Sequence, residues 1–179
     1  MPAALPPPAD VSLRALEDSD LDLLYQLEND ASAWGLASDT LAPVSRYNLR
    51  RYLDSAAADF YEVRQQRLVI CAADGRRALG TIDLFDFHPH HQRAAVGIML
   101  LPSQRGQGYA RAALRELLHY ARHTLHLHQL YCTVAAGNAA SLKLFRRAGF
   151  RRVGVRRAWL RTAHGWQDAV EMQCLLTAE

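Results

Sequence analysis

The chain of 179 residues has few cysteines and no long apolar run. Its three cysteines, Cys71, Cys132 and Cys174, lie in separate apolar segments without paired spacing. This pattern argues against a disulfide framework and favours buried thiols in a reducing cytoplasm. No run approaches the roughly 18 apolar residues that a membrane-spanning helix requires, so no membrane association is expected. The stretch 1–10 is rich in proline and alanine and lacks a basic start before an apolar core, which predicts a loose tail and no signal peptide.

The length and composition of the chain indicate one compact domain. Half of the residues are hydrophobic, which is enough for a sizeable core. No internal repeat or linker divides the chain, so a single domain is expected over residues 11–179. The formal net charge of +3 does not by itself indicate nucleic acid. The arginine pairs at 146–147, 151–152 and 156–157 are interpreted as a solvated face, or as groups that reach a cofactor phosphate, in preference to an RNA site.

The most informative stretch follows an apolar run at 94–100 and opens a strongly periodic helix. It consists of Arg105, Gly106, Gln107, Gly108, Tyr109 and Ala110. Backbone N–H groups at a helix start lack helical partners and carry partial positive charge. Glycines let the backbone approach a pyrophosphate, and the arginine adds a guanidinium. Because no P-loop lysine follows and the third glycine of a dinucleotide fingerprint is missing, a different phosphorylated cofactor is predicted.

Hydrophobic periodicity predicts an alternating arrangement of strands and helices. The expected strands are 11–16, 67–72, 78–87, 94–100, 128–134, 150–155 and 169–176, and the expected helices are 21–28, 46–57, 110–125 and 139–147. Short turns between the second, third and fourth strands predict an antiparallel meander. A helix between the fourth and fifth strands predicts that these two are parallel neighbours. A loop containing Gly165 is expected between the last two strands.

This order of elements resembles that of the GNAT family of N-acetyltransferases, and the resemblance covers residues 11–177. Arg105, Gly108 and Ala110 match the family's acetyl-CoA pyrophosphate motif R-x-x-G-x-A. Residues 138–150, N-A-A-S-L-K-L-F-R-R-A-G-F, resemble the second family signature, N-x-x-S/A-x-x-x-Y/F-x-x-x-G-F. Within the family, the chain is most similar to spermidine/diamine acetyltransferases and to ribosomal-protein N-terminal acetyltransferases.

The resemblance implies an α/β (α+β) GNAT fold, with a mixed sheet of six to seven strands flanked by helices and with splayed central parallel strands. It implies acetyl-CoA as a co-substrate, without a metal, whose pantetheine arm lies between the strands at 94–100 and 128–134. A backbone N–H near Met99 would polarise the thioester carbonyl. Beside the segment 105–110, the implied cofactor-binding residues are Ile98, Met99, Leu100, Asn138, Ser141 and Phe145. Without the resemblance, 98–100 is a plain core strand and Asn138 is a helix cap.

The chemistry requires a neutral amine. An alkyl ammonium with a pKa near 10.4 costs roughly 4.6 kcal/mol to deprotonate at pH 7, so a proton acceptor would help. Glu28, Asp30, Asp83 and Asp86 are candidates, and Asp83 is taken as the catalytic one. Asp83 and Asp86 lie three apart on one strand, so they are expected on opposite faces. Each could instead be a solvated surface carboxylate.

The departing thiolate requires a proton. Many relatives supply it from a tyrosine seven residues after the signature asparagine, but that position is Phe145 here. Ser141 is the alternative donor, because the resemblance to some ribosomal-protein N-terminal acetyltransferases places the acid there, and Tyr131 is a further candidate. A thiol of ordinary pKa near 8.5 also needs little assistance. Ser141 could equally be an ordinary polar helix residue.

The predicted function is acetyl transfer from acetyl-CoA to a primary amine, directly in a ternary complex. The acceptor is a small polyamine-like molecule or a protein N-terminus. Only one acid, Asp39, lies in the stretch 34–47, which disfavours a highly charged polyamine. The alternative is a non-catalytic acyl-CoA-binding sensor or interaction module, favoured by Phe145. Relatives commonly pair, so a homodimer is expected. The histidine clusters at 88–91 and 123–128 lack partners at zinc-like spacing, so no metal site is predicted.

Overall fold

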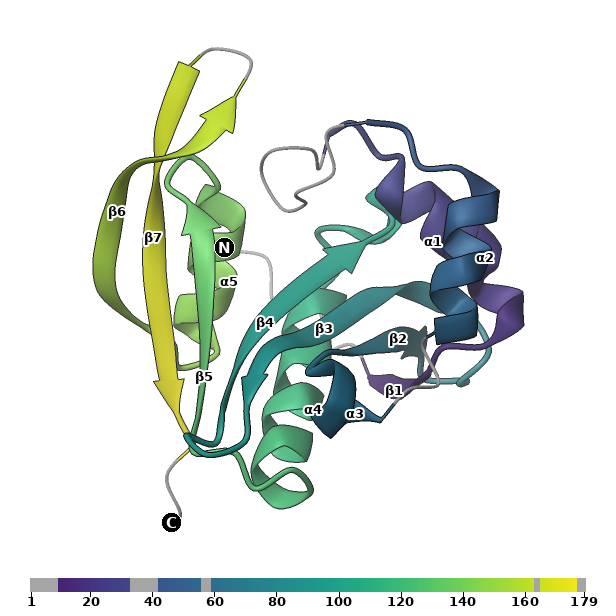
Figure 1. The fold of residues 1–179 in the computed structure, drawn as a ribbon, viewed down its shortest axis with the longest axis horizontal. Helices are drawn as coiled ribbons and strands as arrows, with labels where there is room; N and C mark the ends of the chain where they lie inside the picture. The colour runs from purple at the N-terminus through teal and green to yellow at the C-terminus, as the bar shows by residue number, and fades with distance from the viewer. Residues whose placement is uncertain (1–9, 33–41, 56–58, 163–164, 177–179) are drawn as a thin grey trace, which may run out of the picture.

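The computed structural model describes residues 10–32, 42–55, 59–162 and 165–176. They form one seven-stranded sheet in the order β1-β2-β3-β4-β5-β7-β6 (Figure 1). The strands are β1 (Val11–Ala15), β2 (Gln66–Ala72), β3 (Ala78–His88), β4 (Arg93–Leu100), β5 (Gln129–Ala135), β6 (Arg151–Thr162) and β7 (Gly165–Leu175). The helices are α1 (Leu21–Glu28), α2 (Arg46–Ser55), α3 (Phe60–Val63), α4 (Tyr109–His123) and α5 (Ala139–Arg147). Single 3-10 turns occupy Asp18–Asp20 and Pro102–Gln104.

The sheet topology confirms the predicted meander and crossover. β2, β3 and β4 pair antiparallel in chain order through short turns, and β1 pairs antiparallel with β2 although α1, α2 and α3 lie between them in the chain. Among the described strands, β4 and β5 form the one parallel pair, because α4 carries the chain back between them. The mixed sheet flanked by helices is therefore the predicted α/β arrangement.

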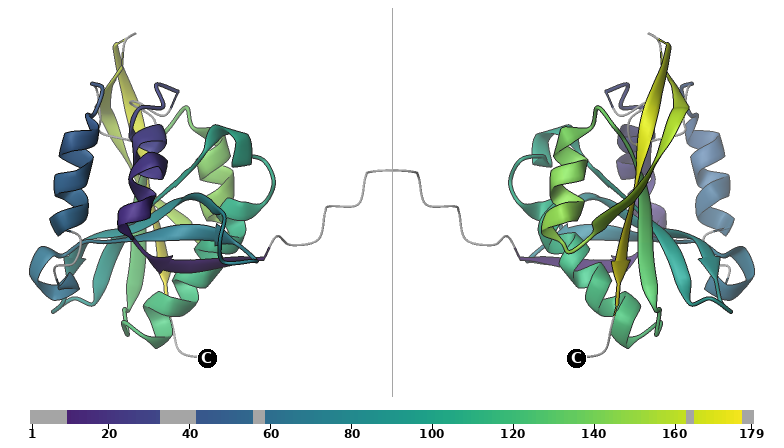
Figure 2. Two further views of the ribbon diagram at one scale, coloured as in Figure 1. Left: turned by 90° about the vertical axis from the view of Figure 1, so that its right-hand side faces the viewer. Right: turned by 90° about the vertical axis from the view of Figure 1, so that its left-hand side faces the viewer.

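The core lies on both faces of the sheet. The apolar stripe of α4, with Phe145 and Phe150, packs on the even-numbered residues of β2 and β4. On the other face, Leu23 and Leu27 of α1 pack against Val69 and Cys71 of β2. Figure 2 shows α1 and α2 on one side of strands β1 to β4 and α4 on the other. Side chains that alternate along a strand thus enter different environments, which fixes the direction of each site residue.

The two strands of the last hairpin are longer than the sequence predicted. The sequence placed strands at 150–155 and 169–176, but β6 runs to Thr162 and β7 starts at Gly165. Most residues of β6 are exposed, and register shifts at Arg152/Gly154 and Arg156/Leu160 interrupt its alternation. An exposed strand with interrupted alternation gives little hydrophobic signal. The four-residue α3, which Asp59 caps by accepting from the Tyr61 N–H, was also not predicted.

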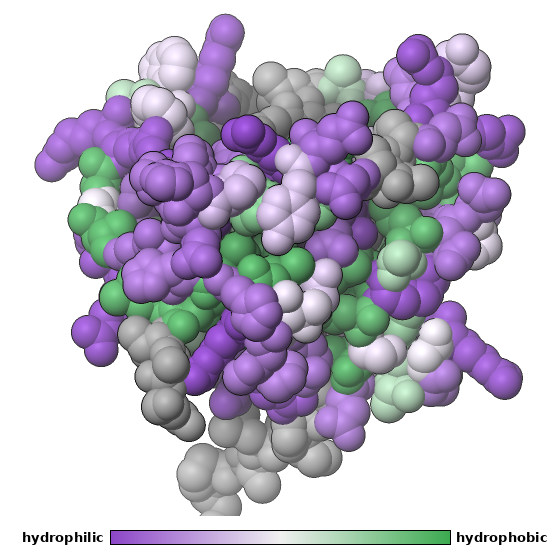
Figure 3. Space-filling model, turned by 60° about the horizontal axis from the view of Figure 1, so that its bottom comes forward, coloured by the Kyte–Doolittle hydropathy of each residue, from purple (hydrophilic) through white to green (hydrophobic). Residues whose placement is uncertain are grey.

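No helix in the described part of the chain is long and apolar enough to cross a membrane. Polar side chains dominate the face seen in Figure 3, with small apolar areas between them. The predicted tail, apart from Asp10, and Asp39 in the stretch 34–47 lie outside the described residues.

Candidate active site

The sheet opens between β4 and β5. These strands pair only through Arg93–Gln129, Ala94–Leu130 and Ala95–Tyr131. Beyond Ala95, β4 continues beside β3 to Leu100, while β5 continues beside β7 to Ala135. The predicted splay of the central parallel strands is therefore confirmed, and Figure 1 shows the two halves of the sheet diverging from this point.

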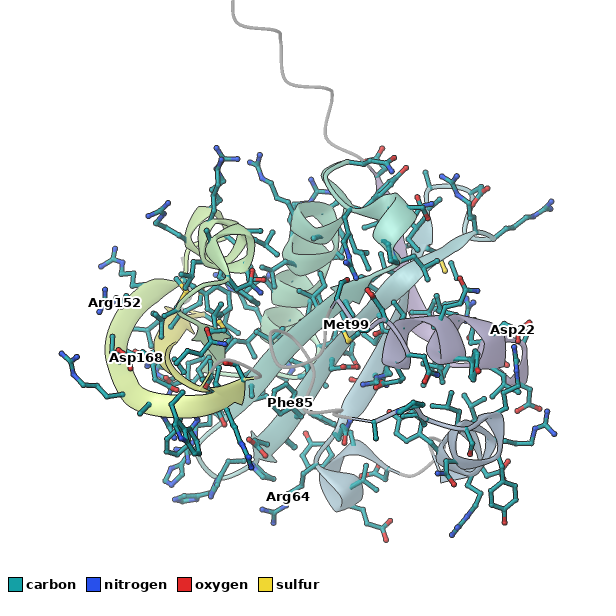
Figure 4. The ribbon with its side chains drawn as sticks, turned by 90° about the horizontal axis from the view of Figure 1, so that it is seen from above. Asp22, Arg64, Phe85, Met99, Arg152 and Asp168 are labelled. Atoms are coloured by element: carbon teal, nitrogen blue, oxygen red, sulfur yellow. The ribbon has the colours of Figure 1, made fainter. Side chains whose placement is uncertain are left out.

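Backbone groups of β4 face this opening at alternate residues. At one end, the Gln92 carbonyl accepts from the His128 N–H at 2.7 Å, on the β5 side. At the other end, the Leu101 N–H donates to the Leu79 carbonyl of β3 at 3.0 Å. Alternation between these points directs the backbone N–H groups of Ile98 and Leu100 toward the opening. They flank Met99, whose side chain packs with the apolar residues beneath α1 (Figure 4).

A pocket lies in the opening and collects residues from three elements. Its lining comprises Val96, Gly97 and Ile98 of β4, Cys132, Thr133 and Val134 of β5, and Asn138, Ser141 and Phe145 around α5. The pocket therefore brings together four of the predicted cofactor-binding residues: Ile98, Asn138, Ser141 and Phe145. The Asn138 Oδ1 accepts from the Ser141 N–H at 3.0 Å, so the capping interpretation of Asn138 is confirmed. Phe145 is buried edge-to-face against Phe150, with ring centroids 5.1 Å apart.

The glycine loop before α4 exposes a series of backbone donors. Gly106 and Gly108 have φ of 76° and 88°, a region that L side chains rarely adopt. No atom of the described residues lies within 4 Å of a Cβ built on either glycine. The backbone N–H groups of residues 106–110 have no recorded partner among the described residues. The Gln107 Nε2 donates to the Ser103 carbonyl at 2.8 Å and holds the loop in place. A diphosphate fits this combination of open space and free donors.

Arg105 is directed toward protein groups in this structure. Its Nε donates to the Leu100 carbonyl and its Nη1 to the Ser32 Oγ, each at 3.1 Å. Its Nη2 forms an ion pair with Asp30, so the guanidinium joins the glycine loop to the chain after α1. Hydrogen bonds from Ser32 and from Arg105 lower the pKa of Asp30.

Asp83 belongs to a network centred on one guanidinium. Arg67 donates to Asp83 through Nε at 2.7 Å and Nη2 at 3.0 Å, and through Nη1 to Glu28 at 3.0 Å. Asp83 is buried, which raises its pKa, while the charge of Arg67 acts against this shift. Both carboxylates therefore share one counterion, and the network fastens α1 to the sheet.

Replacing Asp83 with asparagine is expected to lower the free energy of unfolding by about 3 kcal/mol, because the guanidinium of Arg67, only 14% of whose side chain is exposed, loses its bidentate partner. Urea denaturation measures this loss. The exposed Asp86 provides the matched control, and Asp86→Asn should leave the midpoint almost unchanged. Equal midpoints for the two variants would contradict a structural role for the Arg67–Asp83 pair.

The alternation that placed Asp83 and Asp86 on opposite faces does not hold. Asp86 has φ of 49°, and the register with β4 shifts between Phe85 and His88. Two exposed residues, Phe85 and Asp86, follow each other there. Because a bulge adds a residue on one strand, the counting rule fails beyond it.

Tyr131 and Cys132 alternate on β5. Tyr131 is half-buried, and burial, followed by the charge of Asp86, raises its pKa. Cys132 lines the pocket, and burial raises the pKa of its thiol to about 12. Both groups therefore stay protonated near neutral pH, so Tyr131 retains a proton that it can donate.

One carboxylate near the opening was not considered from the sequence. Glu171 lies on β7 opposite Thr133, and its Oε1 accepts from the Thr133 Oγ1 at 2.8 Å. The available signal was a single acid inside the apolar run of the last strand. No group of three histidine, cysteine, aspartate or glutamate residues in the described ranges is placed to hold a metal ion.

A glycine-lined helix start beside an opening between parallel strands defines a coenzyme-A-dependent acyltransferase. The family model for the acetyltransferase (GNAT) domain matches residues 10–151. The chain therefore belongs to the GNAT family and is an acetyl-CoA-dependent N-acetyltransferase.

The chain is similar to several acetyltransferases whose substrates are named. The chain is 28% identical to spermidine N(1)-acetyltransferase of Escherichia coli over 82% of this chain and 75% of that protein. It is 31% identical to the L-methionine sulfoximine/L-methionine sulfone acetyltransferase of Pseudomonas aeruginosa, over 78% of this chain and 79% of the relative. Spermidine N-acetyltransferase of Vibrio cholerae, in complex with CoA and spermine, superposes with a TM-score of 0.83 at 25% identity, over 93% and 96% of the two chains.

Proposed function

We propose that this enzyme transfers the acetyl group of acetyl-CoA directly to a small primary amine in a ternary complex. The observation that carries the proposal is the pocket between β4 and β5, together with the backbone N–H groups of residues 106–110, which have no hydrogen-bond partner among the described residues. One opening that collects both strands and α5 suits a thioester and an amine that must meet without an intermediate carrier.

Each group of residues in the site has a separate role in the proposed reaction. The N–H groups of the glycine loop bind the pyrophosphate, and the pantetheine arm lies along the open edge of β4. The N–H groups of Ile98 and Leu100 are available to polarise the thioester carbonyl. Ser141, in the pocket, is the proposed proton donor to the thiolate, since Phe145 has no proton to give. Tyr131 remains the second candidate for this role.

Direct transfer is supported by the state of the pocket thiol. Cys132 would be the natural carrier of an acetyl group in a two-step mechanism. A thiol whose pKa is about 12 is almost fully protonated at pH 7, and the thiolate is the nucleophile. A covalent acetyl-cysteine intermediate is therefore disfavoured.

A singly charged acceptor fits the described acids best. Glu28 and Asp83 are both bonded to Arg67, and Glu171 is paired with Arg156. A polyamine with several ammonium groups requires several carboxylates free to bind them, whereas a single ammonium requires one. The named relatives include both kinds of enzyme: one acetylates spermidine, a polyamine, and another acetylates methionine sulfoximine, which has a single amino group. A peptide N-terminus is a third proposed acceptor.

Thiol release from acetyl-CoA with a panel of amines tests the proposed function. The panel contains spermidine, methionine sulfoximine, a simple alkylamine and a peptide with a free N-terminus. We expect turnover with at least one singly charged amine, and mass spectrometry of that product should show one added acetyl group. CoA binding without turnover on any member would instead support the sensor alternative.

Replacing Ser141 with alanine is expected to lower kcat at least tenfold, because the thiolate loses its proton donor, while the Kd for acetyl-CoA stays within about twofold. Stopped-time assays and calorimetry measure the two quantities. The exposed Ser12 on β1 provides the control, and Ser12→Ala should change neither. An unaltered kcat in the Ser141 variant would transfer the role to Tyr131.

We further propose a homodimer that acts in the cytoplasm. Val153, Trp159 and Trp166 expose large apolar side chains on the β6–β7 hairpin, which suits a contact between copies. The free cysteines, two of them buried, suit a reducing compartment. Light scattering during size-exclusion chromatography distinguishes a dimer from a monomer, and a monomer alone would contradict the assembly.

A further inference from the structure

Paired residues align two carboxylates on either side of the opening. On β3, Asp83 lies opposite Gly97 of β4, and on β7, Glu171 lies opposite Thr133 of β5. Gly97 and Thr133 each stand two residues beyond the last parallel pair, which places them at the same level across the opening. Residues paired across neighbouring strands project from the same face of a sheet. Asp83 and Glu171 therefore flank the opening within one row.

This row lies on the face opposite to α4 and α5. The neighbours of these residues along the strands, Cys132, Val134, Val170 and Met172, belong to the core beneath those helices. Gly97 contributes no side chain to the row, and a Cβ there would stand 3.4 Å from the Phe85 ring. Gly97 and Thr133 also line the pocket, so the pocket borders the row that holds the two carboxylates.

Asp83 and Glu171 differ in how many of their carboxylate oxygens are hydrogen-bonded to described residues. Both oxygens of Asp83 accept from Arg67, and Asp83 is buried. Glu171 uses a single oxygen, Oε1, which accepts from the Thr133 Oγ1 and lies 2.9 Å from the Arg156 Nε. Its Oε2 has no recorded partner among the described residues, and its side chain is 18% exposed. Glu171 thus offers one oriented oxygen beside the pocket.

We propose that Glu171 binds the ammonium group of the acceptor and takes its proton before acetyl transfer. This inference rests on the proposed function and assigns its acceptor side. The proton moves from the ammonium to the carboxylate, either directly or through one water. The neutral nitrogen then forms a bond to the thioester carbon, and the carbon–sulfur bond breaks. The thiolate gains the second proton of the nitrogen, by way of the donor in the pocket, and Glu171 returns its own proton to solvent.

The surroundings of Glu171 favour this role. Its charge acts on Tyr131 and Cys132 of β5, and Arg156 of β6 pairs with it. Asp86 of β3 and Arg93 of β4 also act on Tyr131. Burial raises the pKa values of Tyr131 and Cys132, so both groups stay protonated near neutral pH.

The variant Glu171→Gln tests the proposal, because glutamine keeps an oxygen for Thr133 but cannot accept a proton from an ammonium. We expect kcat/KM for the acceptor to fall about 100-fold at pH 7, with the Kd for acetyl-CoA unchanged. The loss should shrink as the pH approaches 10, where the amine loses its proton unaided. Glu116→Gln on α4, whose carboxylate pairs with the neighbouring Arg115 and does not line the pocket, is the matched control and should match the wild type at every pH.

A second variant covers the case in which Glu171→Gln fails to fold. Thr133→Val removes the hydrogen bond that orients Oε1 and keeps the carboxylate, so kcat/KM should fall about tenfold with a normal melting temperature. Activity of Glu171→Gln within twofold of wild type, or a loss that is equal at all pH values, would overturn the proposal while acetyl transfer itself stands. A wild-type chain that binds CoA and acetylates no amine would overturn both.

Discussion

Gly108→Trp is expected to raise the Kd for CoA by at least 100-fold. The indole would occupy the open space above the loop, where no atom of the described part of the chain lies within 4 Å of the Cβ position. A diphosphate held by several backbone N–H groups would lose two or more charge-assisted hydrogen bonds, each worth about 1.5–3 kcal/mol. A loss of about 3 kcal/mol corresponds to roughly 100-fold in affinity. Isothermal titration calorimetry with CoA measures the change.

The control must carry the same backbone strain. Gly108 has φ of +88°, so any side chain there costs about 1–2 kcal/mol of stability whatever its effect on the ligand. Gly165 in the β6–β7 hairpin has φ of +117° and equally open surroundings. Gly165→Trp should therefore lose comparable stability and keep wild-type affinity for CoA. Unchanged affinity in the Gly108 variant, or equal losses in both variants, would refute the assigned phosphate site.

Gly80→Ala should damage both stability and coenzyme binding. A Cβ on Gly80 would stand 2.1 Å from the Met99 carbonyl oxygen and 2.8 Å from the Leu100 Cα. Both are backbone atoms, so β4 itself must move where it borders the opening. Overpacking of this kind typically costs about 1–3 kcal/mol, and a clash with backbone belongs at the upper end.

The displacement of β4 should also raise the Kd for acetyl-CoA about tenfold, because the N–H groups of Ile98 and Leu100 shift with it. Urea denaturation and calorimetry follow the two effects. Gly154→Ala is the matched control, since no described residue has an atom within 4 Å of a Cβ there and Gly154 is also in a strand. Wild-type stability and affinity in Gly80→Ala would show that β4 can accommodate the methyl group without cost.

Local sequence patterns predicted most of what positions the site. Short turns and alternation predicted the meander of β2, β3 and β4, and the helical stripe of α4 predicted the parallel crossover to β5. The glycine pair was recognisable because only backbone at positive φ requires that residue in such a place. The helix cap at Asn138 likewise depends on residues three apart.

Contacts between distant segments could not be predicted in this way. Arg105 bonds to Asp30 and Ser32, which lie more than 70 residues away in the chain. The bulge near Asp86 depends on how β3 meets β4, and no local pattern marks it. Glu171 becomes a candidate only when the register places it beside Thr133. In each case the deciding interaction is tertiary, so propensity and spacing carry no information about it.

Among the described residues, the opening between β4 and β5 leaves the facing edges of two strands without a paired neighbour inside the sheet, where a continuous sheet would have a ladder of hydrogen bonds. The pantetheine arm can therefore serve as a removable extra strand that joins the two halves. A ligand present at 100 times its Kd adds about 2.7 kcal/mol to the free energy of unfolding. The lifetime of this enzyme in a cell would then follow the supply of acyl carriers, so metabolic state would influence how much of the enzyme persists as well as how fast it works.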